Sequence, residues 1–392
     1  MSTITIELLD ANSIGRYYQL AALSTGYVQP RISSTLRDKL EKGVEQGVLQ
    51  LDMNEVQLLF NSVADYLDNY VCKTKPNYSP ILYKAGRYDD KSILRNAGIQ
   101  IGKTLQCVDI ANYLKQNIYQ FLTNKVPTPT FLKAYVYSYY RERVKVKDIS
   151  VASLSLALAG VYISTMGYIR KGGEQFEVSA IPDSSVDTLK DAHRFFALLN
   201  EPKSNVKVSD LIQSILDLEG ISLELSALIA TGIYVYSVAY YVYNLPSLSS
   251  YYNIFERFRL VCITPQKGLV KGRIQFLRPV VLWERPLTLT HIMRTLETAK
   301  ALDILSYTER LASYSPQISG ELREYPEAVS ACVNDLYEYL ETGSFDALVH
   351  CSGGVARLYD LLDDLCRRKN LNQACTILKT VRDFAGCLSR LI

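Results

Sequence analysis

Histidine, tryptophan and methionine are scarce in this chain of 392 residues, which contains only 3 His, 1 Trp and 4 Met. Histidine is the commonest metal ligand and acid–base group, so its scarcity argues against a metal centre and against His-dependent catalysis. The 8 cysteines form no C-x-x-C pair, which excludes the usual zinc and iron–sulfur spacings. We therefore expect no metal, no cofactor and no catalytic residue. We interpret the cysteines as buried thiols. Five of them lie within residues 332–387, and a disulfide among these five is left open for a thermophilic source.

The N-terminal sequence does not have the pattern of a secretory signal peptide. Residues 1–18 have Glu7 and Asp10 where a signal peptide would have basic residues, so we expect a cytoplasmic protein. Two uncharged stretches, 149–169 and 225–245, are long enough to cross a bilayer. Basic residues flank the first on both sides, and five tyrosines lie within the second. We expect both to be buried in a soluble protein and predict no membrane partner, with a membrane span as the alternative.

Charge is strongly segregated along the chain, although the formal net charge is only +3. Residues 125–147 contain six basic side chains and one acidic one, interleaved with four tyrosines. Residues 256–294 contain eight basic side chains and two acidic ones, whereas 301–346 contain nine acidic and two basic ones. Cationic segments with aromatic side chains suit a nucleic acid, because phosphates attract Lys and Arg while bases stack on Tyr. The alternative is that these charges are ordinary solvated faces.

Hydrophobic patterning predicts an α+β fold that is mainly α. Residues 33–47 have the pattern of a short polar helix that stops near Gly47, and Asp52 with Glu55 has the spacing of a capping box before another helix. Alternation of apolar and polar residues predicts a strand over 174–183 and a β-hairpin over 257–277, turning at the sequence PQKG. Further helices are expected over 105–124, 185–199, 209–219 and 221–244, a strand over 48–52, and a loop over 73–103.

From residue 288 onward every segment has the pattern of a helix, which predicts a four-helix or five-helix bundle. We therefore divide the chain into a mixed helical and β-hairpin N-terminal and middle region, 1–287, and a C-terminal helical bundle, 288–392. The Pro-Thr-Pro-Thr sequence near 125–130 marks a sub-boundary in the first region. We expect the first region to contact nucleic acid.

Three short motifs come close to catalytic signatures. Residues 97–104 (AGIQIGKT) fit a loose phosphate-loop pattern in which Lys103 and Thr104 would hold phosphate and magnesium, but no apolar strand precedes them. His291 and Arg294 have a recombinase-like spacing, but Tyr234 occupies the place of the first catalytic arginine. Cys351 follows His350, and adjacency in sequence does not make a catalytic pair. Only the first motif is kept, as an alternative: a nucleotide-dependent enzyme.

A family resemblance rests on the segment 156–187 (LALAGVYISTMGYIRKGGEQFEVSAIPDSSVD), followed by a helical C-terminal unit after a basic middle region. This arrangement resembles the large subunits of archaeal class 1, subtype I-A CRISPR interference complexes, which are Cascade-like antiviral assemblies. The resemblance implies a non-enzymatic subunit that contacts guide RNA and target DNA. It also implies that the helical bundle packs against other subunits of the complex. In such complexes base pairing reads the sequence, while the protein reads a short flanking motif and backbone shape.

The candidate nucleic-acid-binding residues come from the basic segments, together with a pair of cations before two glycines. They are Lys133, Tyr139, Tyr140, Arg141, Arg143, Lys145, Lys147, Arg170, Lys171, Lys267, Lys271 and Arg273. The cations would contact phosphates, and the two tyrosines would stack on bases. A protein-interaction scaffold without nucleic acid remains the third hypothesis, because the acidic bundle would suit a basic partner.

Overall fold

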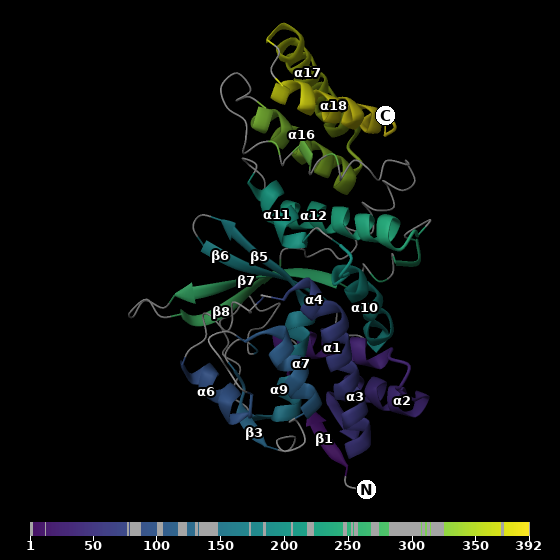
Figure 1. Ribbon diagram of the computed structural model, residues 1–392, viewed down its shortest axis with the longest axis vertical. Coiled ribbons are helices and arrows are strands. Elements are labelled where there is room, and N and C mark those ends of the chain that lie inside the picture. The colour runs from purple at the N-terminus through teal and green to yellow at the C-terminus, as the bar shows by residue number, and fades with distance from the viewer. Residues whose placement is uncertain are drawn as a thin grey trace. The chain divides into compact units, whose positions relative to one another are not determined.

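Figure 1 shows the computed structural model of the chain, which is mainly helical with small antiparallel sheets and a C-terminal helical bundle. This confirms the predicted fold class. The structure describes residues 3–11, 13–76, 78, 88–99, 105–116, 124–129, 132, 148–171, 174–182, 186–204, 207–217, 223–245, 249–251, 254, 258–267, 274–281, 307, 310–311, 314, 325–369 and 372–391.

The chain separates into two compact units. The first comprises 1–205 and 257–284, and the second comprises 206–256 and 285–392. The four-stranded sheet belongs to the first unit, and the C-terminal bundle belongs to the second. Residues 206–256, predicted to belong to the N-terminal and middle region, group with the bundle.

Local sequence signals account for the beginning of the first unit. Strand β1 (Ile4–Glu7) pairs antiparallel with β2 (Val48–Leu51), and α1 (Ile14–Tyr27) lies between them in sequence. Helix α2 (Ser34–Gln46) ends at Gly47, whose φ of +74° favours glycine. Helix α3 (Met53–Tyr66) begins with the predicted capping box between Asp52 and Glu55. The predicted helix over 33–47, the strand over 48–52 and the capping box are thus confirmed.

Helix α9 (Val151–Ser164), which follows the short strand β4 (Asp148–Ser150), is buried along its whole length and forms the centre of the first unit. It packs against α1, and a Cβ atom at Gly160 would lie 1.7 Å from the carbonyl oxygen of Tyr18. Helices α3, α7 (Cys107–Gln116) and α10 (Val186–Leu199) surround this pair (Figure 1). Among the described residues, no helix is long and apolar enough to cross a membrane.

A four-stranded antiparallel sheet completes the first unit, in the order β5 (Thr165–Lys171), β6 (Glu174–Pro182), β7 (Phe258–Lys267) and β8 (Ile274–Val281). The predicted strand over 174–183 and the hairpin are confirmed. The predicted PQKG turn is wrong, because residues 265–267 continue β7 and pair with β8. The connection between these strands is 268–273. The apolar stretch 149–169 is not one long segment, since it contains both α9 and most of β5.

Other short elements modify the predicted loop over 73–103. The π-helix η1 (Leu67–Val71) continues from α3 into α4 (Cys72–Thr74), and α6 (Tyr88–Asn96) lies within the predicted loop. That part of the loop prediction is wrong: the polar pattern is typical of a loop, whereas Ile93 and Leu94 are buried on one side of a short helix. Strand β3 (Lys125–Pro127) pairs antiparallel with β4.

The described part of the second unit contains helices and turns but no strand. Helix α11 (Val208–Leu216) packs on α12 (Leu223–Ser237), which continues into the π-helix η3 (Val238–Val242), and a 3-10 turn, η4, spans Ser249–Tyr251. Helices α16 (Tyr325–Thr342), α17 (Phe345–Lys369) and α18 (Asn372–Leu388) pack in sequence order. The expected C-terminal helical bundle is confirmed; its predicted number of four or five helices depends in part on residues 288–324, most of which lie outside the described residues.

Six of the eight cysteines are disulfide-bonded, as Cys72–Cys107, Cys332–Cys351 and Cys366–Cys375. Only Cys387, among the cysteines with a described side chain, is a buried free thiol. The interpretation of the cysteines as buried thiols is therefore wrong for these six. Two of the disulfides lie in the region between 332 and 387 where the sequence left a disulfide open.

Candidate nucleic-acid interface

Both hairpins of the four-stranded sheet turn at the same end. Lys171 pairs with Glu174 at the tip of β5–β6, and Lys267 pairs with Ile274 at the tip of β7–β8. Because Glu177 pairs with Ile263 in an antiparallel register, Glu174 is level with Gln266. The connections 172–173 and 268–273 therefore leave the sheet from one end. We call this end, with the residues 170–174 and 267–273, the basic end of the sheet.

The described residues place three of the predicted cationic residues at the basic end. Two of them, Arg170 and Lys171, end β5, and Lys267 ends β7, while Lys271 and Arg273 belong to the sequence of the longer connection. Glu174 is the one acidic residue in these two segments. The Arg170 side chain is exposed. Strands about 4.8 Å apart place the centres of the two hairpins roughly 10 Å apart, which is within the span of one nucleic-acid groove.

The other predicted cations belong to a separate part of the chain. The predicted residues Lys133, Tyr139, Tyr140, Arg141, Arg143, Lys145 and Lys147 lie outside the described residues, as do Lys271 and Arg273. The described flanks of that segment meet, because Pro127 of β3 pairs with Asp148 of β4. Residues 128–147 thus connect two neighbouring strands of a different sheet. The strand register brings Arg170, Lys171 and Lys267 to one end of the four-stranded sheet.

A buried polar cluster lies where the four-stranded sheet begins, and sequence reasoning missed it. Lys75 donates hydrogen bonds from Nζ to the Tyr162 carbonyl oxygen at 3.2 Å, to the Asn200 Oδ1 at 2.7 Å and to the Thr165 carbonyl oxygen. Asn200 donates from Nδ2 to the Ile163 carbonyl oxygen at 3.1 Å. These contacts join residues 75, 162–165 and 200, which are far apart in sequence. The cluster therefore had no local signal in the sequence.

Glu177 supplies the negative charge of this cluster. Its side chain is fully buried, and its Oε1 lies 3.4 Å from the hydroxyl of Thr165, which in turn lies 3.3 Å from the Ser179 hydroxyl. Burial lowers the pKa of Lys75 from 10.5 to about 7, and the attraction of Glu177 opposes that change. Although the Lys75 residue as a whole is half-buried, its ammonium group is enclosed by buried acceptors.

Three tyrosines pack around the same charges. The ring of Tyr78 stacks on that of Tyr168 with centroids 5.1 Å apart, and meets that of Tyr162 edge-on at 5.8 Å. Burial, together with the negative charge of Glu177, raises the pKa of Tyr78 and of Tyr168 above its usual range. Both phenols therefore stay protonated at alkaline pH values at which an exposed tyrosine would ionise. Tyr168 pairs directly with Glu177 across β5 and β6, so the cluster lies on the two strands that carry the first hairpin tip.

The described residues offer little support for chemistry elsewhere. The residues just before the phosphate-loop pattern form helix α6, whereas a phosphate loop follows a strand. Lys103 and Thr104, like His291 and Arg294, lie outside the described residues. Cys351 is held in a disulfide, so its sulfur is no free nucleophile. The described part of the chain contains no group of three metal-ligating side chains.

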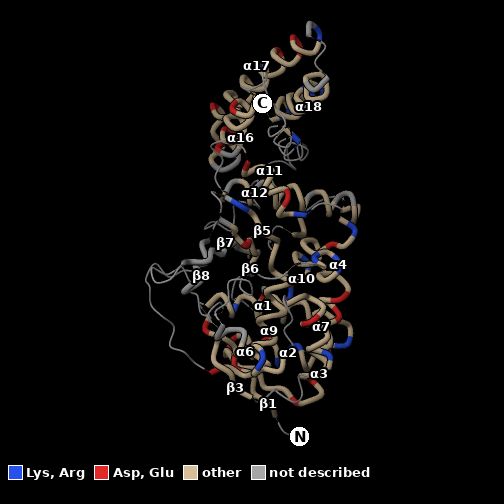
Figure 2. Tube along the Cα trace, turned by 60° about the vertical axis from the view of Figure 1, so that its left-hand side comes forward, with Lys and Arg blue, Asp and Glu red and all other residues tan. Residues whose placement is uncertain are grey.

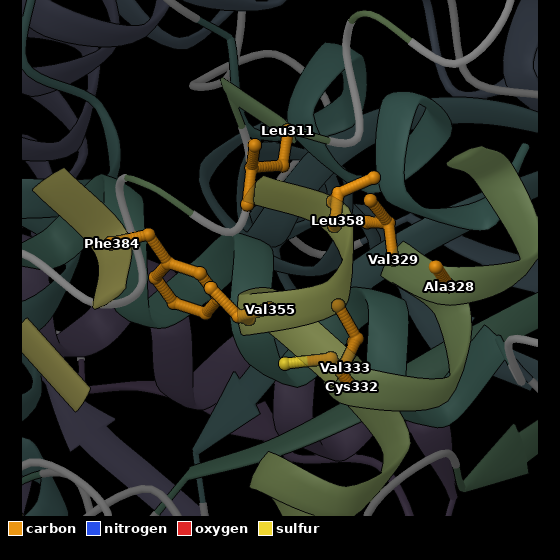
Figure 3. Close-up of a pocket in the computed structure, with 8 residues that line it drawn as sticks. All are labelled: Leu311, Ala328, Val329, Cys332, Val333, Val355, Leu358 and Phe384. Atoms are coloured by element: carbon orange, nitrogen blue, oxygen red, sulfur yellow. The ribbon is translucent and has the colours of Figure 1, made fainter. Parts of the chain in front are cut away.

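A small hollow in the bundle is apolar throughout. It is lined by Leu311, Ala328, Val329, Cys332, Val333, Val355, Leu358 and Phe384 (Figure 3). Such a lining has no donor or acceptor to orient a substrate. Of the helices that line it, α16 is acidic: it carries four acidic residues and no Lys or Arg, and red positions mark its course in Figure 2. This helix is part of the acidic stretch 301–346.

No family model, curated protein or solved structure matches this chain.

Proposed function

We propose that the chain is a nucleic-acid-binding subunit of a multi-protein assembly, of the CRISPR large-subunit kind, and that the basic end of the sheet contacts the phosphate backbone of guide RNA or target DNA. The observation that carries the proposal is the placement of Arg170, Lys171 and Lys267 at one end of an antiparallel sheet. Segments far apart in sequence thereby bring cationic residues to one end of the sheet, which favours contact with a phosphate backbone. The proposal assigns the chain no catalytic step.

The fixed spacing of the strands and the glycines in their connections both favour this assignment. Four hydrogen-bonded strands hold their ends at fixed spacing, so cations on two hairpins meet a phosphate backbone without a large ordering cost. The connections contain Gly172, Gly173, Gly268 and Gly272, and a glycine lets a backbone approach a ligand closely. Neither connection contains an aromatic residue, so the contact assigned to this end is to phosphates rather than to stacked bases.

The test is a charge reversal at the longer connection. The triple variant Lys267→Glu, Lys271→Glu and Arg273→Glu should weaken binding to a fluorescent RNA or DNA. It should also reduce the slope of log affinity against log salt by about three, close to one for each phosphate that is no longer neutralised. Fluorescence anisotropy at two or more salt concentrations measures both effects. Single-stranded and duplex probes should be compared in the same series.

The matched control reverses three exposed cations in the second unit, namely Arg357→Glu, Lys379→Glu and Arg390→Glu. Both triple variants change the net charge equally, so only a site-specific contact separates them. Equal loss of affinity in both would mean that binding is diffuse electrostatics. A wild-type chain that binds neither probe at low salt would leave the scaffold hypothesis in its place. Purification from the native source tests the assembly, since a small guide RNA and other CRISPR subunits should accompany the chain.

A further inference from the structure

Helix α9 passes into strand β5 without a loop. Ser164 is the last helical residue and Thr165 is already extended, with φ −71° and ψ 131°. The last turn of a helix leaves carbonyl oxygens without intrahelical donors, and a glycine in the left-handed conformation commonly helps to satisfy them. Thr165 cannot serve in that way, and it sits in a fully buried place where water cannot take over. The carbonyls of this turn need donors from elsewhere in the chain.

Two side chains from distant segments supply those donors. Lys75 reaches the carbonyls of Tyr162 and Thr165, and Asn200 reaches that of Ile163. The two also bind each other, through the 2.7 Å contact from Nζ to Oδ1. A cation at the C-terminus of a helix is further favoured by the helix dipole. Lys75 thus has three acceptors for its three N–H groups, which is the full complement of an ammonium.

We call the direct transition from α9 to β5, at Ser164 and Thr165, the α9–β5 joint. It determines the direction in which the β5–β6 hairpin leaves the core. Thr165 pairs with Ser179 on β6, and a β-bulge follows at once, where Gly167 adopts a φ of +138° that favours glycine. Only the short stretch from Gly167 to Arg170 separates the bulge from the basic end. On the opposite strand, Glu177 holds the Thr165 side chain and pairs with Tyr168. A shift at Thr165 would therefore be passed along a hydrogen-bonded ladder to Arg170 and Lys171.

We infer that Lys75 is a positioning residue for the basic end, because the hydrogen bonds of its amino group fix the α9–β5 joint and so set the direction in which the β5–β6 hairpin carries Arg170 and Lys171. This inference rests on the proposed function. Lys75 itself touches no ligand, and its effect on binding acts through the hairpin. The charged group that faces it is Glu177 from β6, and the titratable tyrosines that interact with Glu177 are Tyr78 and Tyr168.

The test compares two lysines of one segment. Lys75→Met keeps the length of the side chain and removes the ammonium, whereas Lys73→Met makes the same change at an exposed position two residues earlier. We expect Lys75→Met to weaken nucleic-acid binding about as much as the double variant Arg170→Ala and Lys171→Ala, and Lys73→Met to stay within about twofold of wild type. Fluorescence anisotropy with the RNA and DNA probes measures all three.

A double-mutant cycle separates positioning from a general loss of stability. If Lys75 acts through the hairpin tip, Lys75→Met should cause no further loss of affinity when Arg170 and Lys171 are already alanine. A full additional loss of affinity in that background would overturn the inference. Wild-type affinity in Lys75→Met would overturn it as well. Asn200→Ala, which removes a second donor to the same joint, gives a milder variant should Lys75→Met fail to fold.

Amide hydrogen exchange tests the joint independently of binding. Lys75→Met should speed exchange over residues 165–182 and leave 325–342 in the second unit unchanged. Unchanged exchange over 165–182 would overturn the positioning role even if nucleic acid binds. A third outcome is that Lys75→Met speeds exchange over 165–182 although the wild-type chain binds no nucleic acid. That outcome would contradict the proposed function and would support the role of Lys75 at the α9–β5 joint.

Discussion

Different kinds of contact stabilise the interior of each of the two units. In the first unit, polar side chains reach across long sequence separations to buried acceptors: Arg16 donates to the carbonyl of Val44, and Gln19 to Ser153, as Lys75 and Asn200 do at the α9–β5 joint. In the second unit, helices that follow one another in sequence pack through apolar side chains and are joined by two disulfides. Buried polar contacts define one geometry, because their removal leaves unpaired groups, whereas apolar packing tolerates more.

This difference fits the roles proposed for the two units. A surface that binds phosphates needs cations at defined positions. The polar contacts of Lys75 and Asn200, where β5 begins, hold the strand in one position. A helical bundle that serves as a docking unit needs stability and an accessible surface. We therefore expect small changes in the first unit to disturb the fold strongly, and comparable changes in the second to have modest or even favourable effects.

The largest effect is expected at the crossing of α1 and α9. Gly160→Ala would place a Cβ 1.7 Å from the Tyr18 carbonyl oxygen, so two buried helices would have to separate. We expect this variant to lose about 3 kcal/mol of unfolding free energy, at the upper end for overpacking in a core. Urea denaturation followed by circular dichroism measures the change. A variant as stable as wild type would show that the crossing is looser than the structure indicates.

A somewhat smaller effect is expected from the disulfide between α17 and α18. The double variant Cys366→Ser and Cys375→Ser opens a short loop whose ends are 9 residues apart. Loop-closure entropy then predicts a loss of about 2–3 kcal/mol in the stability of the bundle. Urea denaturation without reductant measures it. In reducing buffer the difference between the two proteins should vanish, and a difference that persists there would assign the loss of stability to packing of the serines instead.

The sequence predicted well the elements that depend on neighbouring residues. The capping box at Asp52 and Glu55 and the left-handed stop at Gly47 are local signals, and both are observed. The change from α9 to β5 occurs at Ser164 and Thr165, and the nearest glycine, Gly167, already lies within the strand, so the apolar stretch 149–169 gave no sign of a boundary at Thr165. The predicted turn of the second hairpin, PQKG, was also misplaced, because Pro265 pairs with β8 and the connection begins only after Lys267. Local pattern marks where helices and strands start and stop, unless burial hides the boundary.

The candidate site was predictable only in part, for a related reason. Charge along the chain pointed to Arg170, Lys171 and Lys267, but strand register was needed to put them at one end of a sheet. The cluster around Lys75 and Glu177 had no signal, because a lysine in a polar segment has the sequence pattern of a solvated residue. Its environment is created by residues about 90 to 125 positions away. Long-range contacts of this kind follow from the fold and not from composition.

The pH dependence of stability sharpens the comparison between the units. The pKa of Lys75 falls from 10.5 to about 7 on folding, so between these values the unfolded chain binds more protons at this group than the folded chain. Stability from Lys75 therefore rises with pH from 7 to 9, and below pH 7 it no longer changes. The unfolding free energy of wild type relative to Lys75→Met should rise with pH, by at most about 1.4 kcal/mol per unit. Urea denaturation at several pH values measures this difference, and a constant difference would contradict it.

The smallest effect is expected at Gly353, within α17. The change Gly353→Ala is the counterpart, in the second unit, of Gly160→Ala in the first. A Cβ there would meet no described atom within 4 Å, and the residue is exposed. Glycine within a helix costs about 0.5–1 kcal/mol relative to alanine, so Gly353→Ala should stabilise the bundle by that amount. Urea denaturation measures the gain, with Gly160→Ala as the opposite case. If Gly353→Ala lost stability as Gly160→Ala does, the contrast between a tightly crossed core and a tolerant bundle would fail, because the same added methyl group would then meet resistance in both units.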